Sequence, residues 1–294
     1  MKQNIQPHYF ETATAWHEHE LLDSGDGKIL ERFGKMVLVR PYAQAFWPKS
    51  TPELWQENHA RFQADLHNFG GKWLYKDNAQ KSWPLRWEML RFQTQLGASQ
   101  HIGVFPEEIK HWLWLQDTIK KAQNPVKVLH LWAYTGLMNL VATHAGADVT
   151  HVDSSKHGIG WAMANQKLSS RKDAPIRYIQ EEPLKFIKRE ARREKNYNAL
   201  ILQFPRMENE EESRYTDFLK QLPDLILAIK DILDPNPQFI LITAPACIHP
   251  VTTQAIVDDL KPGRGTISSG VICLKEKSAG HLLPHASFTR WSSN

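Results

Sequence analysis

Apolar residues in the second half of the chain alternate between short continuous runs and helical stripes. The pattern is clearest between Val126 and Asp153, where apolar runs at 126–132 and 148–152 flank a turn and a helical segment. In that segment, apolar residues recur at helical spacing from Leu137 until Gly146. The stretch predicts a strand, a helix and a second strand, with a tight turn directly after the first strand.

The same alternation continues to the end of the chain and predicts a mostly parallel sheet with helices in its crossovers. Strands are expected near 126–132, 148–152, 176–180, 197–203, 238–243, 266–274 and 282–291. Helices are expected near 137–145, 155–168, 183–194, 214–233 and 250–260. No helix separates the last two strands, so the last one should enter the sheet antiparallel. The predicted fold is α/β, with a Rossmann-like sheet of seven strands.

The first part of the chain has a different composition, because most of the 11 tryptophans precede Val126. Glycine-bearing turns predict a hairpin or small meander before Arg40, and the spacing from Pro52 to Asn68 predicts a helix. The aromatic runs between Trp73 and Leu96 suit either core strands or a base-stacking platform, and burial is the favoured interpretation. We therefore expect a smaller, tryptophan-rich α+β domain at 1–104 and a second domain at 105–294.

Composition narrows the class of protein only coarsely. With 41% hydrophobic and 23% charged residues, no apolar run of membrane-spanning length and no signal-peptide core, a cytoplasmic protein without a membrane partner is expected. The two cysteines provide neither a disulfide framework nor zinc-ligand spacing, so no metal is expected. A net charge of +4 is a weak indication of an acidic partner such as RNA.

Residues that directly follow the predicted strands are the candidates for ligand binding, since parallel strands bring their carboxyl ends to one edge of a sheet. Asp153 could accept hydrogen bonds from ribose hydroxyls, one of two glutamates could accept from an adenine amino group, and Gly136 could allow close backbone approach. These features suit NAD or an adenosylmethionine cofactor. The candidates at the four strand ends are Ala133, Tyr134, Thr135 and Gly136; Asp153; Glu181 and Glu182; and Gln203, Phe204, Pro205 and Arg206.

Several motifs resemble the class I S-adenosylmethionine-dependent methyltransferases of the bacterial ribosomal-RNA methyltransferase-like family. The resemblance covers nearly the whole chain and is carried by HELLDSGDGKILERFGKMVLVRP, GVFPEEIKHW, VLHLWAYTG and HVDSSKHGIGWAMANQ. It implies S-adenosylmethionine as cofactor and ribosomal RNA as substrate, with Tyr134–Gly136 as the cofactor loop, Asp153 as the ribose ligand and Glu182, with Glu181, at the adenine. The single glycine of the turn also disfavours NAD, whose pyrophosphate needs a glycine-richer approach.

The chain departs from the pattern of this family at the end of the fourth strand. Relatives have Asp-Pro-Pro-Lys near the methyl-transfer site, whereas this sequence has Gln203-Phe204-Pro205-Arg206. The resemblance makes Gln203, Pro205 and Arg206 the catalytic candidates, yet glutamine cannot take up a proton near neutral pH. An alternative is therefore a catalytically degenerate protein that binds cofactor or RNA without methyl transfer. Two further departures are Leu137, which should add bulk beside the cofactor, and Glu108, which stands where glutamine is common.

Three other features have simpler expected roles. Cys247 lies one residue from the position of the nucleophile used in cytosine-C5 methylation, and a buried or incidental thiol is the favoured interpretation. Glu107 and Glu108 suit the first turn of a helix. The basic segment at 184–196 predicts a solvated helix with internal salt bridges.

Overall fold

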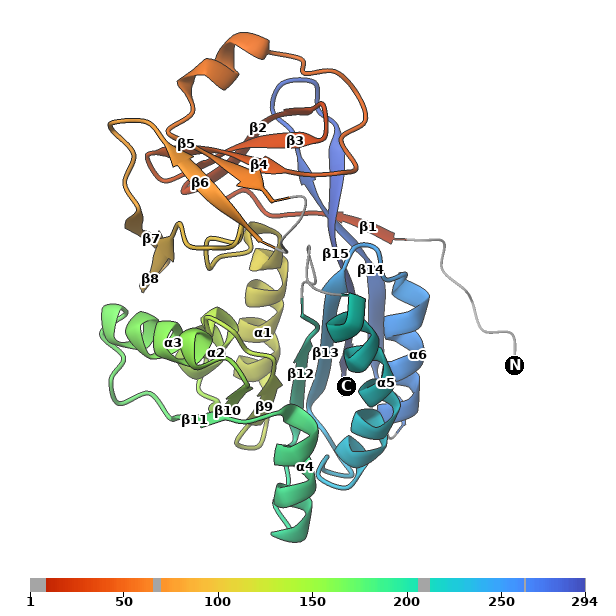
Figure 1. The fold of residues 1–294 in the computed structure, drawn as a ribbon. Helices are drawn as coiled ribbons and strands as arrows, with labels where there is room; N and C mark the ends of the chain where they lie inside the picture. Colours follow the sequence, from red (N-terminus) through yellow and green to blue (C-terminus); the bar gives the residue numbers. More distant parts are fainter. Residues whose placement is uncertain (1–8, 66–69, 206–211, 262, 294) are drawn as a thin grey trace.

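A computed structural model of the protein describes residues 9–65, 70–205, 212–261 and 263–293 (Figure 1). Its larger sheet contains eight strands, and all run parallel except β15, which pairs antiparallel with both β13 and β14. The seven predicted strands and the reversed last strand are thus confirmed, and β1 joins the edge as an unpredicted eighth strand. The strand order is β1 (Tyr9–Thr12), β14 (Thr266–Lys275), β15 (Leu282–Ser292), β13 (Phe239–Pro245), β12 (Ala199–Gln203), β9 (Lys127–Leu131), β10 (Asp148–Asp153) and β11 (Ile176–Gln180).

Helices cover both faces of this sheet, which explains why its central strands β9, β12 and β13 are almost entirely buried. Along β9, the side chain of Val128 packs into the cluster formed with α1 and α2, whereas Leu129 and Leu131 pack into the cluster formed with α4, α5 and α6. The five predicted crossover helices are confirmed as α2 (Leu137–His144), α3 (Lys156–Leu168), α4 (Pro183–Arg192), α5 (Glu212–Lys230) and α6 (Pro250–Leu260). A further helix, α1 (Ile109–Lys121), begins directly after Glu107 and Glu108, where the sequence indicated the first turn of a helix. None of the described helices is long and apolar enough to cross a membrane.

A second sheet of five strands lies over one end of the large sheet (Figure 1). It consists of β2 (His19–Gly25), β3 (Lys28–Phe33), β4 (Met36–Pro41), β5 (Ala60–Ala64) and β6 (Gly71–Tyr75), and the hairpin β7 (Ser82–Trp87) and β8 (Leu90–Gln95) follows it. The predicted meander before Arg40 is confirmed, since β2, β3 and β4 pair in sequence. Trp73, Trp83 and Trp87 are buried in the core, so the aromatic runs form packing surfaces.

The predicted helix from Pro52 to Asn68 is wrong. The structure has a short 3-10 helix, η1 (Pro52–Glu57), followed by strand β5. Strand pairing explains the difference, because β5 lies between β4 and β6 and its buried Ala60 and Phe62 alternate with exposed residues. Trp55 still covers the sheet as expected, packing against residues of β3 and β4. Leu66, the last apolar residue of the predicted stripe, lies outside the described residues.

The two sheets are joined by the hairpin of β14 and β15, which extends from the large sheet to the five-stranded sheet (Figure 1). At the tip of the hairpin, the backbone N–H of Lys277 donates to the carbonyl of Leu21 at 2.9 Å. Lower down, the Tyr42 hydroxyl donates to the carbonyl of Pro284 at 2.5 Å. These contacts connect residues more than 200 positions apart and fix the five-stranded sheet over the strand ends.

Candidate active site

A cavity of about 690 Å³ lies at the carboxyl ends of β9, β10 and β12, where the topology brings the predicted strand-end residues together. Its lining includes six of the residues singled out from the sequence: Tyr134, Asp153, Glu182, Gln203, Phe204 and Pro205. Arg206, the remaining catalytic candidate, lies outside the described residues. The volume is within the ~300–1,000 Å³ typical of small-molecule sites.

The loop after β9 places only Tyr134 of its four candidates in the cavity lining. Ala133 and Thr135 are buried, and the Thr135 hydroxyl donates to the carbonyl of Gly103 at 2.8 Å. Gly136 has φ +70°, and a Cβ there would lie 2.9 Å from the Cβ of Ala162. Ala133, Thr135 and Gly136 therefore support the loop on the side away from the cavity. Gly136 also allows the loop to pack closely against α3.

Asp153 connects the first two strand ends. Its two carboxylate oxygens accept backbone N–H groups from Tyr134 and Ser155, each at 2.8 Å. Only 7% of the residue is exposed, and this burial raises the pKa of its carboxyl group despite the two hydrogen bonds. The N-terminus of α3 is capped by Ser155, whose hydroxyl accepts the Gly158 N–H at 3.0 Å. Asp153 is thus not needed as the helix cap and has acceptor capacity left toward the cavity.

The two glutamates after β11 lie in different surroundings. Glu181 forms ion pairs with Arg189 and, at 3.7 Å, with Lys185, both on α4. These pairs, together with those between Glu190 and its neighbouring arginines, confirm the predicted salt-bridged helix. Glu182 directly precedes α4 and lines the cavity. Of the pair, the geometry therefore favours Glu182 as the group that faces a ligand.

Gln203 at the end of β12 belongs to a buried chain of polar side chains. Its Nε2 donates to Oε1 of Glu108 at 2.9 Å, and its Oε1 lies 3.2 Å from Nε2 of His130. The Asn139 amide then bridges Nδ1 of His130 at 2.6 Å and Nδ1 of His151 at 2.7 Å. Glu108 therefore does more than begin a helix: it fixes the orientation of the Gln203 amide beside the cavity.

His130 and His151, the two histidines of this polar network, are uncharged near neutral pH. Burial lowers the pKa of His130 to about 4, and burial together with the neighbouring His130 lowers the pKa of His151 to about 3. A neutral imidazole carries one N–H, and both atoms facing His130 are amide oxygens, so His130 donates to either Asn139 or Gln203 but not to both. The two histidines therefore add no positive charge to this network near neutral pH.

Aromatic side chains of Trp132, Phe204 and Phe218 form one wall of the cavity. Trp132 follows β9, and its ring lies 5.3 Å from that of Phe218 on α5. Phe204 also lies 5.3 Å from Phe218. Phe204 was among the predicted strand-end candidates, and Trp132 could have been suspected from its position directly after a strand, but Phe218 has no such signal. Leu137, by contrast, packs into the core and does not line the cavity, so the expected bulk beside a cofactor is absent there.

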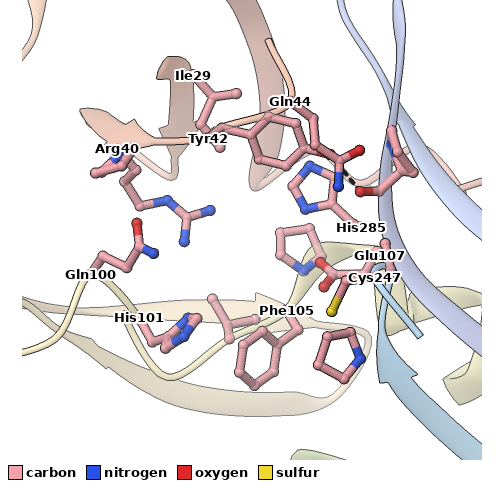
Figure 2. Close-up of a pocket in the computed structure, with 16 residues that line it drawn as sticks. Ile29, Arg40, Tyr42, Gln44, Gln100, His101, Phe105, Glu107, Cys247 and His285 are labelled. Atoms are coloured by element: carbon pink, nitrogen blue, oxygen red, sulfur yellow. Dashed lines mark hydrogen bonds between the residues drawn. The ribbon is translucent and has the colours of Figure 1, made fainter. Parts of the chain in front are cut away.

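A second cavity, of about 460 Å³, adjoins the first and lies beneath the five-stranded sheet (Figure 2). His101 and Phe105 line both cavities, so these two residues form the partition between them. Cys247 is exposed and lines the second cavity, so of the two expected alternatives, a buried or an incidental thiol, the buried one is wrong. Cys273 is buried within β14, as expected.

The buried histidines predict a specific loss of stability in mild acid. In the unfolded chain, histidines take up protons below their ordinary pKa of about 6.5, whereas folded His130 stays neutral until about pH 4. The free energy of unfolding should therefore fall as the pH drops from 6.5 toward 4, with His130 contributing on the order of 3 kcal/mol. Urea unfolding across this range should show a shallower pH dependence for His130→Gln than for the wild type. The control His157→Gln, at an exposed position, should keep the full dependence, and equal slopes in all three proteins would contradict the assignment.

The similarity to known structures extends over nearly the entire chain. The crystal structure of the SAM-dependent methyltransferase from Agrobacterium tumefaciens superposes with a TM-score of 0.87 and shares 34% sequence identity, covering 97% of this chain and 94% of that one. A Streptococcus mutans protein described as a SAM-dependent methyltransferase superposes with a TM-score of 0.66 at 17% identity, covering 93% of this chain and 75% of its own.

A third structure, described as a methyltransferase in complex with SAH, gives a TM-score of 0.65 at 16% identity, with the same coverage of 93% and 75%. At such low identities, these last two similarities concern the fold alone. No protein-family model matches the sequence, and no curated protein matches it either.

Proposed function

This chain belongs to the class I S-adenosylmethionine-dependent methyltransferases, and we propose that it transfers the methyl group of that cofactor to RNA. The observation that supports the site of transfer is the cavity at the strand ends, which combines an acceptor-only carboxylate, a tight backbone loop and an aromatic wall. S-adenosylmethionine is the cofactor, and it supplies a methyl group on a positively charged sulfur.

In the proposed binding mode, each strand end holds a different part of the cofactor. Asp153 accepts hydrogen bonds from the ribose hydroxyls, because its carboxylate lies in the cavity and is already oriented by two backbone N–H groups. Glu182 accepts a hydrogen bond from the adenine amino group. Glu181 stabilises the neighbouring backbone through its ion pairs with Lys185 and Arg189 of α4. The loop at 133–136 lets the backbone approach the amino-acid portion.

At the reacting end, the chain provides positioning rather than proton transfer. Gln203 has one amide hydrogen and one carbonyl lone pair beyond those used by Glu108 and His130, and these can orient an acceptor. Pro205 lines the cavity beside it, and we assign Arg206 to the same region by resemblance. A methyl displacement depends mainly on alignment in a desolvated site, so a carboxylate at position 203 is not required.

RNA as the acceptor is supported by the net charge of +4, the family resemblance of the motifs, and the covered second cavity next to the first. Ribosomal RNA is the substrate implied by the resemblance, and we place the reaction in the cytoplasm. The competing interpretation is a protein that binds cofactor or RNA without transferring methyl groups. The two interpretations differ in whether labelled methyl groups appear on an acceptor.

Incubation with methyl-labelled S-adenosylmethionine and separated fractions of RNA, protein and small molecules tests the proposal. RNA prepared from cells that lack this protein should accept the label, because its target positions are unmodified. Label in the protein or small-molecule fraction would overturn RNA as substrate. Cofactor binding without label in any fraction would favour the non-catalytic interpretation.

A further inference from the structure

The second cavity is lined by residues from both sheets. Residues of β3, β4 and the segment after β4 form one side, and Pro245 to Cys247, which end β13 and follow it, form the other. Because His101 and Phe105 line both cavities, a group bound here lies next to the cavity that we propose for the cofactor.

Arg40 at the end of β4 is directed into this cavity. Figure 2 shows its guanidinium pointing toward the centre, and only 9% of the residue is exposed. Nε and Nη2 both donate to Oε2 of Glu31, at 2.8 and 2.5 Å. Within the described part of the chain, Nη1 has no hydrogen-bond partner, so a buried and oriented donor remains available to a ligand.

Glu31 keeps this donor in place. Burial alone would raise the pKa of its carboxyl group, but the charge of Arg40 and the hydrogen bond from His19 outweigh burial and lower the pKa to about 2. The His19 Nε2 lies 3.0 Å from the second carboxylate oxygen. Glu31 therefore remains ionised at neutral pH and anchors two of the three guanidinium nitrogens, which leaves the third fixed in direction.

The other lining groups indicate the chemistry of the occupant. Arg40 is the one arginine or lysine among the described lining residues, and the carboxyl group of Glu107 lies across from it, so a phosphate would find no second cation. Flat surfaces are abundant: Phe105 on the floor, and Tyr42 stacked on His285 with ring centroids 5.0 Å apart and planes 25° apart. The side-chain amides of Gln44 and Gln100 add donors and acceptors at the edge.

We propose that this cavity holds an unstacked nucleobase, with its carbonyl oxygen hydrogen-bonded to Nη1 of Arg40. The inference rests on the proposed function for its RNA source and deepens it by naming the base-recognition residue. A neutral planar ring fits the flat walls and the nearly balanced charge, and its carbonyl oxygen satisfies the remaining guanidinium N–H. Arg40 is thereby a specificity residue, and the Glu31–His19 pair positions it.

Binding of the four ribonucleosides to the protein saturated with S-adenosylhomocysteine tests the inference, with saturation-transfer NMR as the readout. Base protons of uridine, cytidine or guanosine should show transfer at millimolar concentration. Adenosine lacks a ring carbonyl and should bind most weakly. Inorganic phosphate should not displace the bound nucleoside, and displacement would show an anion site and overturn the inference.

Matched variants distinguish a loss of nucleoside recognition by Arg40 from a general loss of folding. Arg40→Lys keeps a positive charge for Glu31 but cannot also reach the ligand, so nucleoside affinity should fall about tenfold or more while affinity for S-adenosylhomocysteine is unchanged. The pair Arg40→Gln with Glu31→Gln removes both buried charges and should give the same loss. Arg61→Lys, at an exposed position on β5, should bind nucleosides like the wild type. Unchanged nucleoside affinity in Arg40→Lys, or absence of binding by all four nucleosides, would overturn the inference.

A parallel methyl-transfer assay distinguishes this inference from the proposed function. Label in RNA at the wild-type rate for Arg40→Lys would overturn base recognition by Arg40 and leave RNA methylation standing. Label confined to protein, together with Arg40-dependent nucleoside binding, would overturn RNA as the substrate and leave the nucleobase site standing.

Discussion

Gln203→Asp is expected to lower the free energy of unfolding by about 2–3 kcal/mol and to give no gain in methyl transfer. The substitution would restore the acid that relatives have at the end of this strand. In this protein, however, the 203 side chain donates a hydrogen bond to buried Glu108 at 2.9 Å, and a carboxylate cannot donate. Two carboxyl groups would share the site, so one would have to take up a proton.

The double variant Glu108→Gln with Gln203→Asp is the matched control. It moves the carboxylate from position 108 to position 203 and keeps an amide donor opposite it, so most of the lost stability should return. Urea unfolding of the wild type, both single variants and the double variant gives the coupling energy, which should be about 1–3 kcal/mol. Strictly additive effects would mean that the contact between Glu108 and Gln203 has no energetic role.

Asp153→Ala should weaken binding of S-adenosylhomocysteine, the demethylated cofactor, by about 1–3 kcal/mol, because the proposed charged hydrogen bonds to the ribose are lost. It should also lower stability, since the N–H groups of Tyr134 and Ser155 lose their acceptor. Calorimetric titration with S-adenosylhomocysteine measures the first effect, and thermal unfolding without ligand measures the second. Full affinity in a folded Asp153→Ala protein would mean that the ribose is held elsewhere.

Glu181 and Glu182 provide an internal comparison for this titration. Glu182→Ala should weaken binding, because Glu182 lines the cavity, whereas Glu181→Ala should leave affinity near the wild-type value, because its ion pairs lie along α4. The reverse result would assign the adenine contact to Glu181.

The sequence predicted the large sheet well because its signals are local. The central strands β9, β12 and β13 are buried on both faces and read as short apolar runs, as in Val128 to Leu131, and the crossover helices carry apolar stripes of their own. The strand ends then follow from topology, which is why Tyr134, Asp153, Glu182 and Gln203 were predicted near one another.

Features that depend on contacts between residues far apart in the sequence could not be predicted from local patterns. Phe62 fits a helical stripe and a strand equally well, and pairing with β4 and β6 decides for the strand. Glu108 and Gln203 are 95 positions apart, and nothing local in either segment shows that they share a hydrogen bond. The Arg40 cavity requires four distant segments to meet, at 29–44, 100–107, 245–247 and 284–285, so no single motif marks it.

The central claim is that a site with Gln203 in place of an acid still transfers a methyl group to RNA. A single-turnover reaction tests it most directly: enzyme in excess over methyl-labelled S-adenosylmethionine is mixed with RNA from cells lacking this protein, and S-adenosylhomocysteine and RNA-bound label are counted. We predict that both appear together in equal amounts. Cofactor that stays bound and unconverted while RNA remains unlabelled would contradict the account.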